Sequence, residues 1–386
     1  MHVSVFVGPL SRSPEDDSAV IDMCLAQAVE VAQAGAAMVT FGEQHYSGYE
    51  PYCNPFIMAG RVSQDLGDAW FGTTIVPLTF HNPLRTAEDA SVVDLLLRGR
   101  FVMGMSMGRS GPVPDYANNG LDPAQRKEIF ASRLQVLTDA LGHRPGDPPL
   151  VVDTPWDKGR LDPRMAPLSY RSGGPQLAIG SNTDATIAMA AQRGWPVFLG
   201  PCMPQAAVRS FGLHRDAMSA AGATAKQVER AASLSLVTRN VIVAETDDAA
   251  WDLAESMMGR TFWMDRKNDD RTIRQMAEED LSGIDAAQLG LPVPGPKKDP
   301  HLANSIFAQS WLLAGSPDSI VRQLKEYEAL GIGHLNVRTT VGAYNAELMT
   351  RMHDLLVTEV LPAVGAQPFP TLEPTEIRTM HGGTGA

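Results

Sequence analysis

This sequence has few cysteines, no long apolar run and no basic run among its first residues. Its three cysteines, Cys24, Cys53 and Cys202, form no CxxC pair, which argues against a disulfide framework or a zinc ribbon and favours a reducing compartment. No apolar run approaches the roughly 18 residues of a membrane span. The start of the chain carries no basic segment of the kind that opens a signal peptide. We therefore expect a cytoplasmic protein that does not act at a membrane.

Positive charge is also scarce. Lys and Arg total 32 against 44 Asp and Glu, which gives a net charge of −12 at pH 7. Because nucleic-acid binding depends on clustered positive charge, this balance argues against a nucleic-acid partner. Hydrophobic residues make up 44% of the 386 residues and charged residues 20%, as expected of a globular chain with a large core. The length alone allows two domains or one enlarged barrel.

Several common catalytic motifs are missing as well. The sequence has no GxGxxG after a strand, no GxxxxGK[ST], no HExxH and no GxSxG. These motifs carry dinucleotide binding, P-loop phosphate binding, zinc-dependent proteolysis and serine hydrolysis. Their absence argues against those classes, and we predict no metal site.

What the sequence does contain is an alternation of short β-rich runs with helical patterns. Such an alternation is typical of βα units that build a parallel sheet. Eight pairs of strand and helix predict the α/β class and a (β/α)8 TIM barrel with insertions. The expected strands are residues 2–7, 37–41, 70–77, 101–105, 176–179, 196–199, 233–244 and 334–338. The expected helices are 18–34, one from residue 83 onward, 123–141, 183–193, 205–221, 247–259, 317–330 and 347–361.

Three segments lie outside this alternation. Residues 142–174 are rich in Pro and Gly and are predicted to be an insertion. Residues 260–304 form a long polar stretch, which in a barrel is more often a lid or mobile insertion than a plain connection. Residues 365–386 are predicted to be a C-terminal tail. We therefore assign residues 1–364 to one barrel domain that carries the insertion and the lid-like segment.

Active sites of such barrels form at the carboxyl ends of the strands, so polar residues just after each strand are the candidates. Glu43 and His45 follow the second expected strand in the sequence GEQHY. An acid and an imidazole can position or deprotonate a reacting group there, or they can simply hydrogen-bond to neighbouring loops. His81 and Asn82 follow the third strand, and we interpret them as structural loop residues.

Two further loops on the same face are suited to an anion. Residues 104–111, GMSMGRSG, follow the fourth strand and combine flexible glycines with the cation Arg109. Residues 179–184, IGSNTD, lie where a strand gives way to a helix, so free N–H groups can hold a phosphate. Each loop also has a plain structural interpretation, as a turn or as an N-cap by Ser181 or Asn182. Together they favour a phosphorylated cofactor.

Four segments form a recognisable pattern in this order: GEQHY, FGTTIVPLTFHNPLRTAEDASVVDLLLRGRFVMGMSMGRSG, IGSNTDATIAMAAQRGWP and AGSPDSIVRQLKEYEALGIGHLNV. They resemble the bacterial luciferase-like flavin-dependent monooxygenase superfamily from the first strand to about residue 337, most specifically over residues 82–108. The resemblance implies a (β/α)8 barrel, a homodimer and a site for reduced FMN from a separate flavin reductase. In another branch of the superfamily the cofactor is the deazaflavin F420.

The resemblance also implies roles for single residues. Glu43 matches the family's acidic residue near the flavin ring. Thr74 and Ile75 match a bulge with a non-prolyl cis peptide under the isoalloxazine. The segment 260–304 resembles the loop that closes over the substrate. The residues matched to the phosphate are Arg109, in a loop that looks longer than in luciferase, and Arg126 and Ser181.

One position departs from the family pattern. Gln44 stands where luciferase has the middle residue of Glu-His-His, and an amide cannot act as a base near neutral pH. His45 can act instead only if its ring turns into the pocket.

Our leading hypothesis is an FMN-dependent monooxygenase, an oxidoreductase in which Glu43 and His45 orient the reactants. Reduced FMN and O2 would form a flavin C4a-hydroperoxide that oxygenates a small, partly hydrophobic substrate. The alternatives are an F420-dependent oxidoreductase that transfers a hydride and a flavin-binding paralogue without turnover. Arg109 and Ser181 suit either cofactor, because both carry a ribityl phosphate. The excess of acidic residues favours FMN over the polyglutamate tail of F420.

Overall fold

Eight parallel strands close into a barrel. The computed structural model describes residues 1–11, 13–46, 48, 50–109, 113–162, 164–254, 311–339 and 346–378. The strands follow the order β11-β1-β2-β3-β4-β7-β8, and β9 pairs with both β8 and β11, so the predicted TIM barrel is confirmed. The bounds are β1 His2–Phe6, β2 Met38–Phe41, β3 Trp70–Pro77, β4 Phe101–Ser106, β7 Gln176–Gly180, β8 Val197–Leu199, β9 Leu236–Val243 and β11 His334–Arg338.

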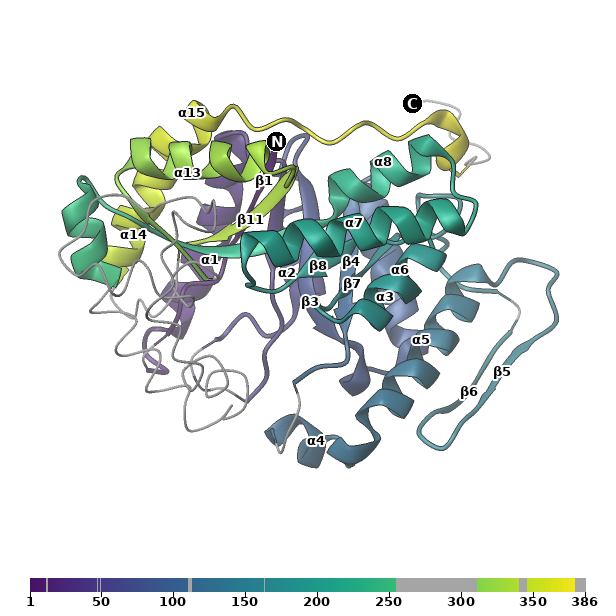
Figure 1. Cartoon of the computed structure of the whole chain (residues 1–386). Coiled ribbons are helices and arrows are strands. Elements are labelled where there is room, and N and C mark those ends of the chain that lie inside the picture. The colour runs from purple at the N-terminus through teal and green to yellow at the C-terminus, as the bar shows by residue number, and fades with distance from the viewer. Residues whose placement is uncertain are drawn as a thin grey trace, which may run out of the picture.

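Helices surround the barrel (Figure 1). In the helix that follows Asn82, Ala87, Ala90 and Val93 recur at helical spacing and are buried, as packing on the strands requires. The helices are α1 Asp17–Gln33, α2 Pro55–Val62, α3 Pro83–Leu96, α4 Pro114–Asn118, α5 Arg126–Gly142, α6 Asp184–Gln192, α7 Pro204–Ala220, α8 Ala225–Leu234, α13 Pro317–Ala329, α14 Ala346–Leu355 and α15 Leu361–Val364. Residues 247–254 are also helical.

The expected strands and helices are confirmed with small shifts at their ends, except that residues 255–259 of the helix expected over 247–259 lie outside the described residues. One boundary is wrong. The strand expected over residues 233–244 begins only at Leu236, because α8 continues to Leu234. A capping box formed by Thr224 and Gln227 starts this helix. Among the elements that were not predicted are α2, α4, α8 and the short strand β10 Leu312–Gly315, which pairs with the last residues of β9.

An antiparallel hairpin lies within residues 142–174 and projects beside α5 (Figure 1). Its strands are β5 Leu150–Asp153 and β6 Lys158–Leu161. Between them, Asp157 accepts two hydrogen bonds from Arg133 of α5, at 2.9 and 3.1 Å, and both side chains are buried. Arg133 also donates to the carbonyl of Thr79, just past β3. The hairpin is therefore tied to the carboxyl end of β3.

Residues 365–378 cross the amino end of the barrel (Figure 1). The ring of Phe369 stacks on that of His2, with centroids 4.5 Å apart. It also packs edge-on against the ring of Trp70, with centroids 5.4 Å apart. Farther along, Arg171 and Ile377 form a β-bridge. The boundaries drawn from the sequence stay predictions, and the segment 260–304 lies outside the described residues.

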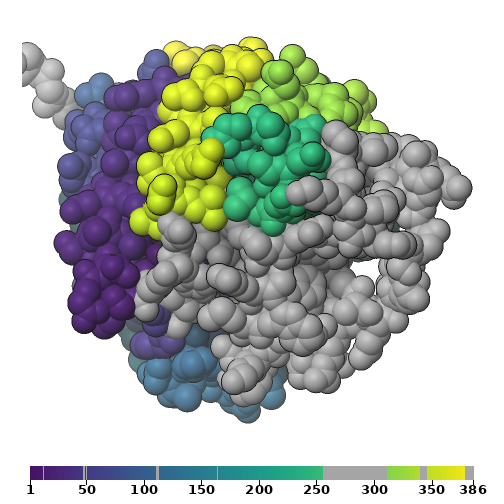
Figure 2. Space-filling model, turned by 90° about the vertical axis from the view of Figure 1, so that its left-hand side faces the viewer, coloured from purple at the N-terminus to yellow at the C-terminus, as the bar shows by residue number. Residues whose placement is uncertain are grey.

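Helices α1 and α14, which are far apart in the sequence, meet on the outside of the barrel. In Figure 2, α1 in purple lies beside the C-terminal helices in yellow. Nε2 of His353 in α14 lies 2.7 Å from Oε2 of Glu30 in α1. None of the described helices is both long and apolar enough to cross a membrane.

Candidate active site

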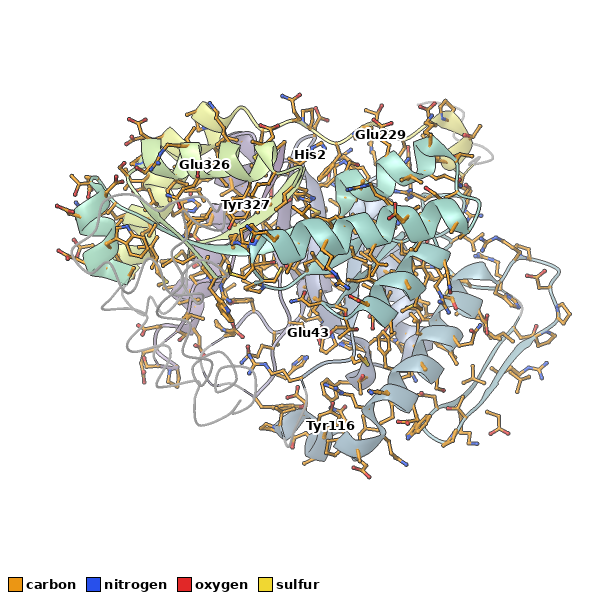
Figure 3. The ribbon with its side chains drawn as sticks, viewed as in Figure 1. His2, Glu43, Tyr116, Glu229, Glu326 and Tyr327 are labelled. Carbon is orange, nitrogen blue, oxygen red and sulfur yellow. The ribbon has the colours of Figure 1, made fainter. Side chains whose placement is uncertain are left out.

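A cavity of about 760 Å³ lies at the carboxyl ends of the barrel strands. Figure 3 shows Glu43 at the end of the barrel opposite to His2, the first residue of β1. Residues at or just after the ends of β1, β2, β3, β4, β7, β8 and β11 line it, together with Leu236, Thr238 and Asn240 of β9. Loops that follow different strands meet at this face of a TIM barrel, so side chains from distant parts of the sequence converge there.

Glu43 is the buried centre of a three-residue cluster. Its side chain is 1% exposed, and Oε1 lies 2.7 Å from Nε2 of His45 and 2.5 Å from Nε2 of His81. The predicted pair of Glu43 and His45 therefore does come together, and both residues line the cavity. The interpretation of His81 as only a loop residue missed this contact. The strand-end rule that selected Glu43 applies equally to His81.

The cluster changes how its members ionise. Burial alone would raise the pKa of Glu43, but hydrogen bonds from His45 and His81 outweigh it, and the pKa lies below its ordinary value. The hydrogen bond to Glu43 raises the pKa of His45 against the opposing effect of burial, and Asp115 of α4 adds to the rise. A carboxylate beside an easily protonated imidazole is an arrangement that can hold and transfer a proton.

Strand β3 is irregular where it borders the cavity. The Thr74–Ile75 peptide bond is cis, and the pairing of β3 with β4 shifts register between Thr73 and Val76. The cis peptide and the bulge expected from the resemblance are thus present, while their role under a flavin ring stays a prediction. Oγ1 of Thr74 is buried and has no hydrogen-bond partner among the described residues. A Cβ atom on Gly180 would lie 2.9 Å from Ile75, so a larger residue there would displace that side chain.

Two of the three residues expected at a phosphate line the cavity. Arg109 is exposed, and its Nη2 lies 3.5 Å from Oε1 of Gln44. Ser181 also lines the cavity, and its Oγ accepts a hydrogen bond from the N–H of Thr183 at 3.1 Å. Thr183, and not Ser181 or Asn182, is the N-cap residue of α6. The hydroxyl of Ser181 therefore lies beside the start of this helix.

Arg126, the third expected residue, has a different position. It donates a hydrogen bond to the carbonyl of Gly108 at 3.2 Å and is not among the described residues that line the cavity. Gly108 has a φ of 72°, a conformation that glycine adopts without strain. Arg126 thus supports the loop that carries Arg109.

An ion pair on the cavity wall was missed by sequence reasoning. Arg338 ends β11, lies 3.7 Å from Glu50 and places its guanidinium 4.7 Å from the centre of the Phe6 ring. The same strand-end rule could have selected Arg338. Phe198 and Trp311 add apolar surface to the cavity.

Comparison with known proteins agrees with this geometry. A family model described as luciferase-like monooxygenase matches residues 1–334. The chain is 29% identical over 177 residues to the 4-hydroxyprotoasukamycin monooxygenase of Streptomyces nodosus subsp. asukaensis, and this alignment covers 46% of each protein. The chain thus spans less than half of that relative's length. It is also 22% identical over 304 residues to the F420-dependent glucose-6-phosphate dehydrogenase of Amycolatopsis mediterranei, which covers 76% of this chain and 79% of that protein.

A solved structure shares the fold. It is the oxygenating constituent of the 3,6-diketocamphane monooxygenase of Pseudomonas putida, described as a type II Baeyer-Villiger monooxygenase in complex with FMN. The TM-score is 0.70 at 18% identity, over 94% of this chain and 98% of that one. At this identity the likeness concerns the fold alone.

Glu43→Gln should destabilise the protein most within one window of pH. The pKa of Glu43 lies below its ordinary 4.5 and that of His45 above 6.5, so both groups are charged between these values. The stabilisation is lost as the pH falls through the folded-state pKa of Glu43 and as it rises through that of His45. Urea denaturation should show the largest difference between wild type and variant at about pH 5 to 6.

The matched control is Glu30→Gln, which removes the carboxylate from a second Glu–His pair far from the cavity. Glu30 is 51% exposed and burial lowers the pKa of its partner His353, so we expect a small loss of stability without that maximum. A destabilisation by Glu43→Gln that is the same at every pH would contradict the charged pair.

Proposed function

The chain belongs to the luciferase-like monooxygenase family, and from this premise we propose that it is an FMN-dependent monooxygenase. It would take reduced FMN from a separate flavin reductase and use O2 to oxygenate a small, partly hydrophobic organic substrate. The observation that carries the proposal is a single cavity bordered by Glu43 and His45, by Arg109 and Ser181, and by the bulge of β3.

The cavity has the size and surface that a flavin ring needs. About 760 Å³ falls within the roughly 300–1,000 Å³ typical of ligand sites. The ring has an apolar face and polar edges, and Phe198 and Leu236 offer apolar contact. The unpaired hydroxyl of Thr74 would find a partner at a ring edge, which relieves the cost of leaving it buried and unbonded. These features support a ring held against Thr74 and Ile75.

The other wall is suited to the phosphate. Arg109 supplies a permanent positive charge, Ser181 a hydroxyl, and the start of α6 the positive end of a helix dipole. Arg126 would act indirectly, through its hydrogen bond to Gly108 in the loop of Arg109. Together they support a phosphate seat formed by Arg109 and Ser181.

When bound, reduced FMN supplies the electrons that activate O2. The protein's own residues would orient the reactants, exclude water and hold protons. Glu43 favours the protonated form of His45, which lines the cavity, so an imidazole is available although Gln44 cannot act as a base. This supports a site competent for turnover over a non-catalytic flavin-binding paralogue.

The second candidate is an F420-dependent oxidoreductase, and one relative named above favours it. F420 ends in a polyglutamate tail, which would call for a basic groove. The described charged residues that line the cavity are two arginines and three acids, namely Arg109, Arg338, Glu43, Glu50 and Asp115. This mixture supports FMN over a polyanionic ligand.

Binding and oxygen uptake distinguish the candidates. Anaerobic titration of the purified protein should give a Kd for reduced FMN at least about tenfold lower than for reduced F420. With a flavin reductase and FMN present, the protein should then change the stoichiometry of O2 uptake and H2O2 release relative to reductase alone. Tighter binding of F420 would contradict the FMN assignment, and FMN binding that leaves this stoichiometry unchanged would point to the paralogue without turnover.

We further propose that the protein works in the cytoplasm as a homodimer. Of the five large hydrophobic side chains exposed on the described residues, three lie on α2 and α3, which pack together. They are Ile57, Val92 and Leu96. Single exposed apolar residues are common, but three on adjacent helices support a surface that a second copy covers.

Ile57→Glu should break such a dimer. Ile57 is 69% exposed, so the new charge does not disturb the core of the monomer, but it would be desolvated at the interface. Sedimentation equilibrium should show a mass falling toward the 41.6 kDa of one chain. Val151→Glu, at a 62% exposed position on the hairpin, is the control and should stay dimeric. A wild-type protein that is already monomeric would refute the proposal.

A further inference from the structure

We propose that His81 is a positioning residue which, with Glu43, sets the tautomer and the charge of His45. The inference rests on the proposed function in assigning a use to His45. His81 would supply a second imidazole to a site where Gln44 replaces the one that the family pattern leads us to expect.

Both imidazoles are directed at one oxygen atom. Oε1 of Glu43 lies 2.7 Å from Nε2 of His45 and 2.5 Å from Nε2 of His81, and the three atoms all lie within 4.8 Å of one another. An ionised carboxylate can only accept hydrogen bonds, so Nε2 of each ring carries its proton toward Glu43. Nδ1 of His45 makes no hydrogen bond to any described residue, so it is the ring nitrogen that can exchange a proton with a ligand.

The three side chains differ in their access to the cavity. His45 lines the cavity, 28% exposed, and Glu43 is almost completely buried beside it. His81 is 21% exposed but is not among the described residues that line the cavity. His81 can therefore influence a ligand through Glu43 and His45, and this is why we call it a positioning residue.

The loop that carries His81 is held on both sides. Before it, the carbonyl of Thr79 accepts a hydrogen bond from Arg133, and the Thr79 hydroxyl donates to the carbonyl of Met107 at 2.9 Å. After it, the side chain of Asn82 accepts two backbone N–H groups and caps α3. The hairpin in residues 142–174 thus contributes to the site, since Asp157 holds Arg133 in place. Because these hydrogen bonds hold the loop in place, the imidazole of His81 is positioned before any ligand binds.

One carboxylate is shared by two groups that can each become positive. Two imidazolium ions this close repel each other, and Glu43 can neutralise only one of them. Protonation of His81 therefore disfavours protonation of His45. With His81 gone, Glu43 would favour the charged form of His45 alone. Among the described residues, the other titratable or charged groups around His45 are Asp115 of α4, Tyr46 and, beside the neighbouring Gln44, Arg109.

A purely structural role for His81 predicts something different. If His81 only satisfied the buried carboxylate as a neutral donor, any side chain with an N–H group at the same place would replace it. His81→Gln retains such a donor and cannot carry a charge. The two roles can therefore be separated by the titration of His45.

The test is NMR titration of the histidine ring protons in the ligand-free protein, with EDTA present so that no stray metal ion bridges the cluster. In His81→Gln, the midpoint of His45 should move up by roughly one pH unit, because its competitor for Glu43 is gone. The control is His353→Gln, which removes the imidazole that pairs with Glu30. It should leave the titration midpoint of His45 unchanged. A His45 midpoint in His81→Gln equal to that of wild type would overturn the proposal.

A second variant keeps the test decisive if His81→Gln folds poorly. Glu43→Gln should lower the midpoint of His45, and adding His81→Gln to it should have a much smaller effect than in wild type, because the shared partner is already gone. Equal effects in both backgrounds would refute the coupling through Glu43. These measurements use the ligand-free protein, so they do not depend on whether the cofactor is FMN or F420. Failure of flavin binding would count against the proposed function and not against the cluster.

Discussion

The burial of the Glu43 carboxylate is the constraint on which the arrangement of the site depends. An ionised carboxylate that is 1% exposed is costly unless charged or hydrogen-bonding groups compensate for the lost water. Here the partners are His45, two residues along the chain, and His81, from the loop after the next strand. Satisfying one buried oxygen therefore fixes the relative positions of the ends of β2 and β3. The hydrogen bond between Glu43 and His45 raises the pKa of this imidazole, which lines the cavity.

The packing of the C-terminal arm and the candidate site lie at opposite ends of the barrel. At the amino end, the arm that carries Phe369 packs on His2 and Trp70. At the carboxyl end, Thr74 Oγ1 and Glu43 Oε2 are buried and have no hydrogen-bond partner within the part of the chain that the structure describes. A TIM barrel allows this division because its strands form a rigid core that tolerates costly groups at one face.

The sequence predicted the barrel well because its strands and helices alternate with clear periodicity, as in the stripe of Ala87, Ala90 and Val93. It missed α2 and β10 because short elements carry little periodic signal, and their formation depends on packing against the rest of the chain. It selected Glu43 and His45 correctly as neighbours but dismissed His81. Which side chains meet at the strand ends depends on how neighbouring strands pair in register. The sequence of a single segment does not determine that pairing. For the same reason, the turn of Arg126 toward Gly108 could not be read from its position in the chain.

We propose above that the cavity binds a flavin with its phosphate at Arg109 and Ser181. The most direct test compares the affinity for FMN with that for riboflavin, which has the same ring and ribityl chain but no phosphate. We predict that wild type prefers FMN by at least about tenfold, that Arg109→Gln loses most of this preference, and that Arg338→Gln, at the other arginine of the cavity, retains it. Equal affinities of wild type for FMN and riboflavin, or a preference for FMN that survives in Arg109→Gln, would contradict the account.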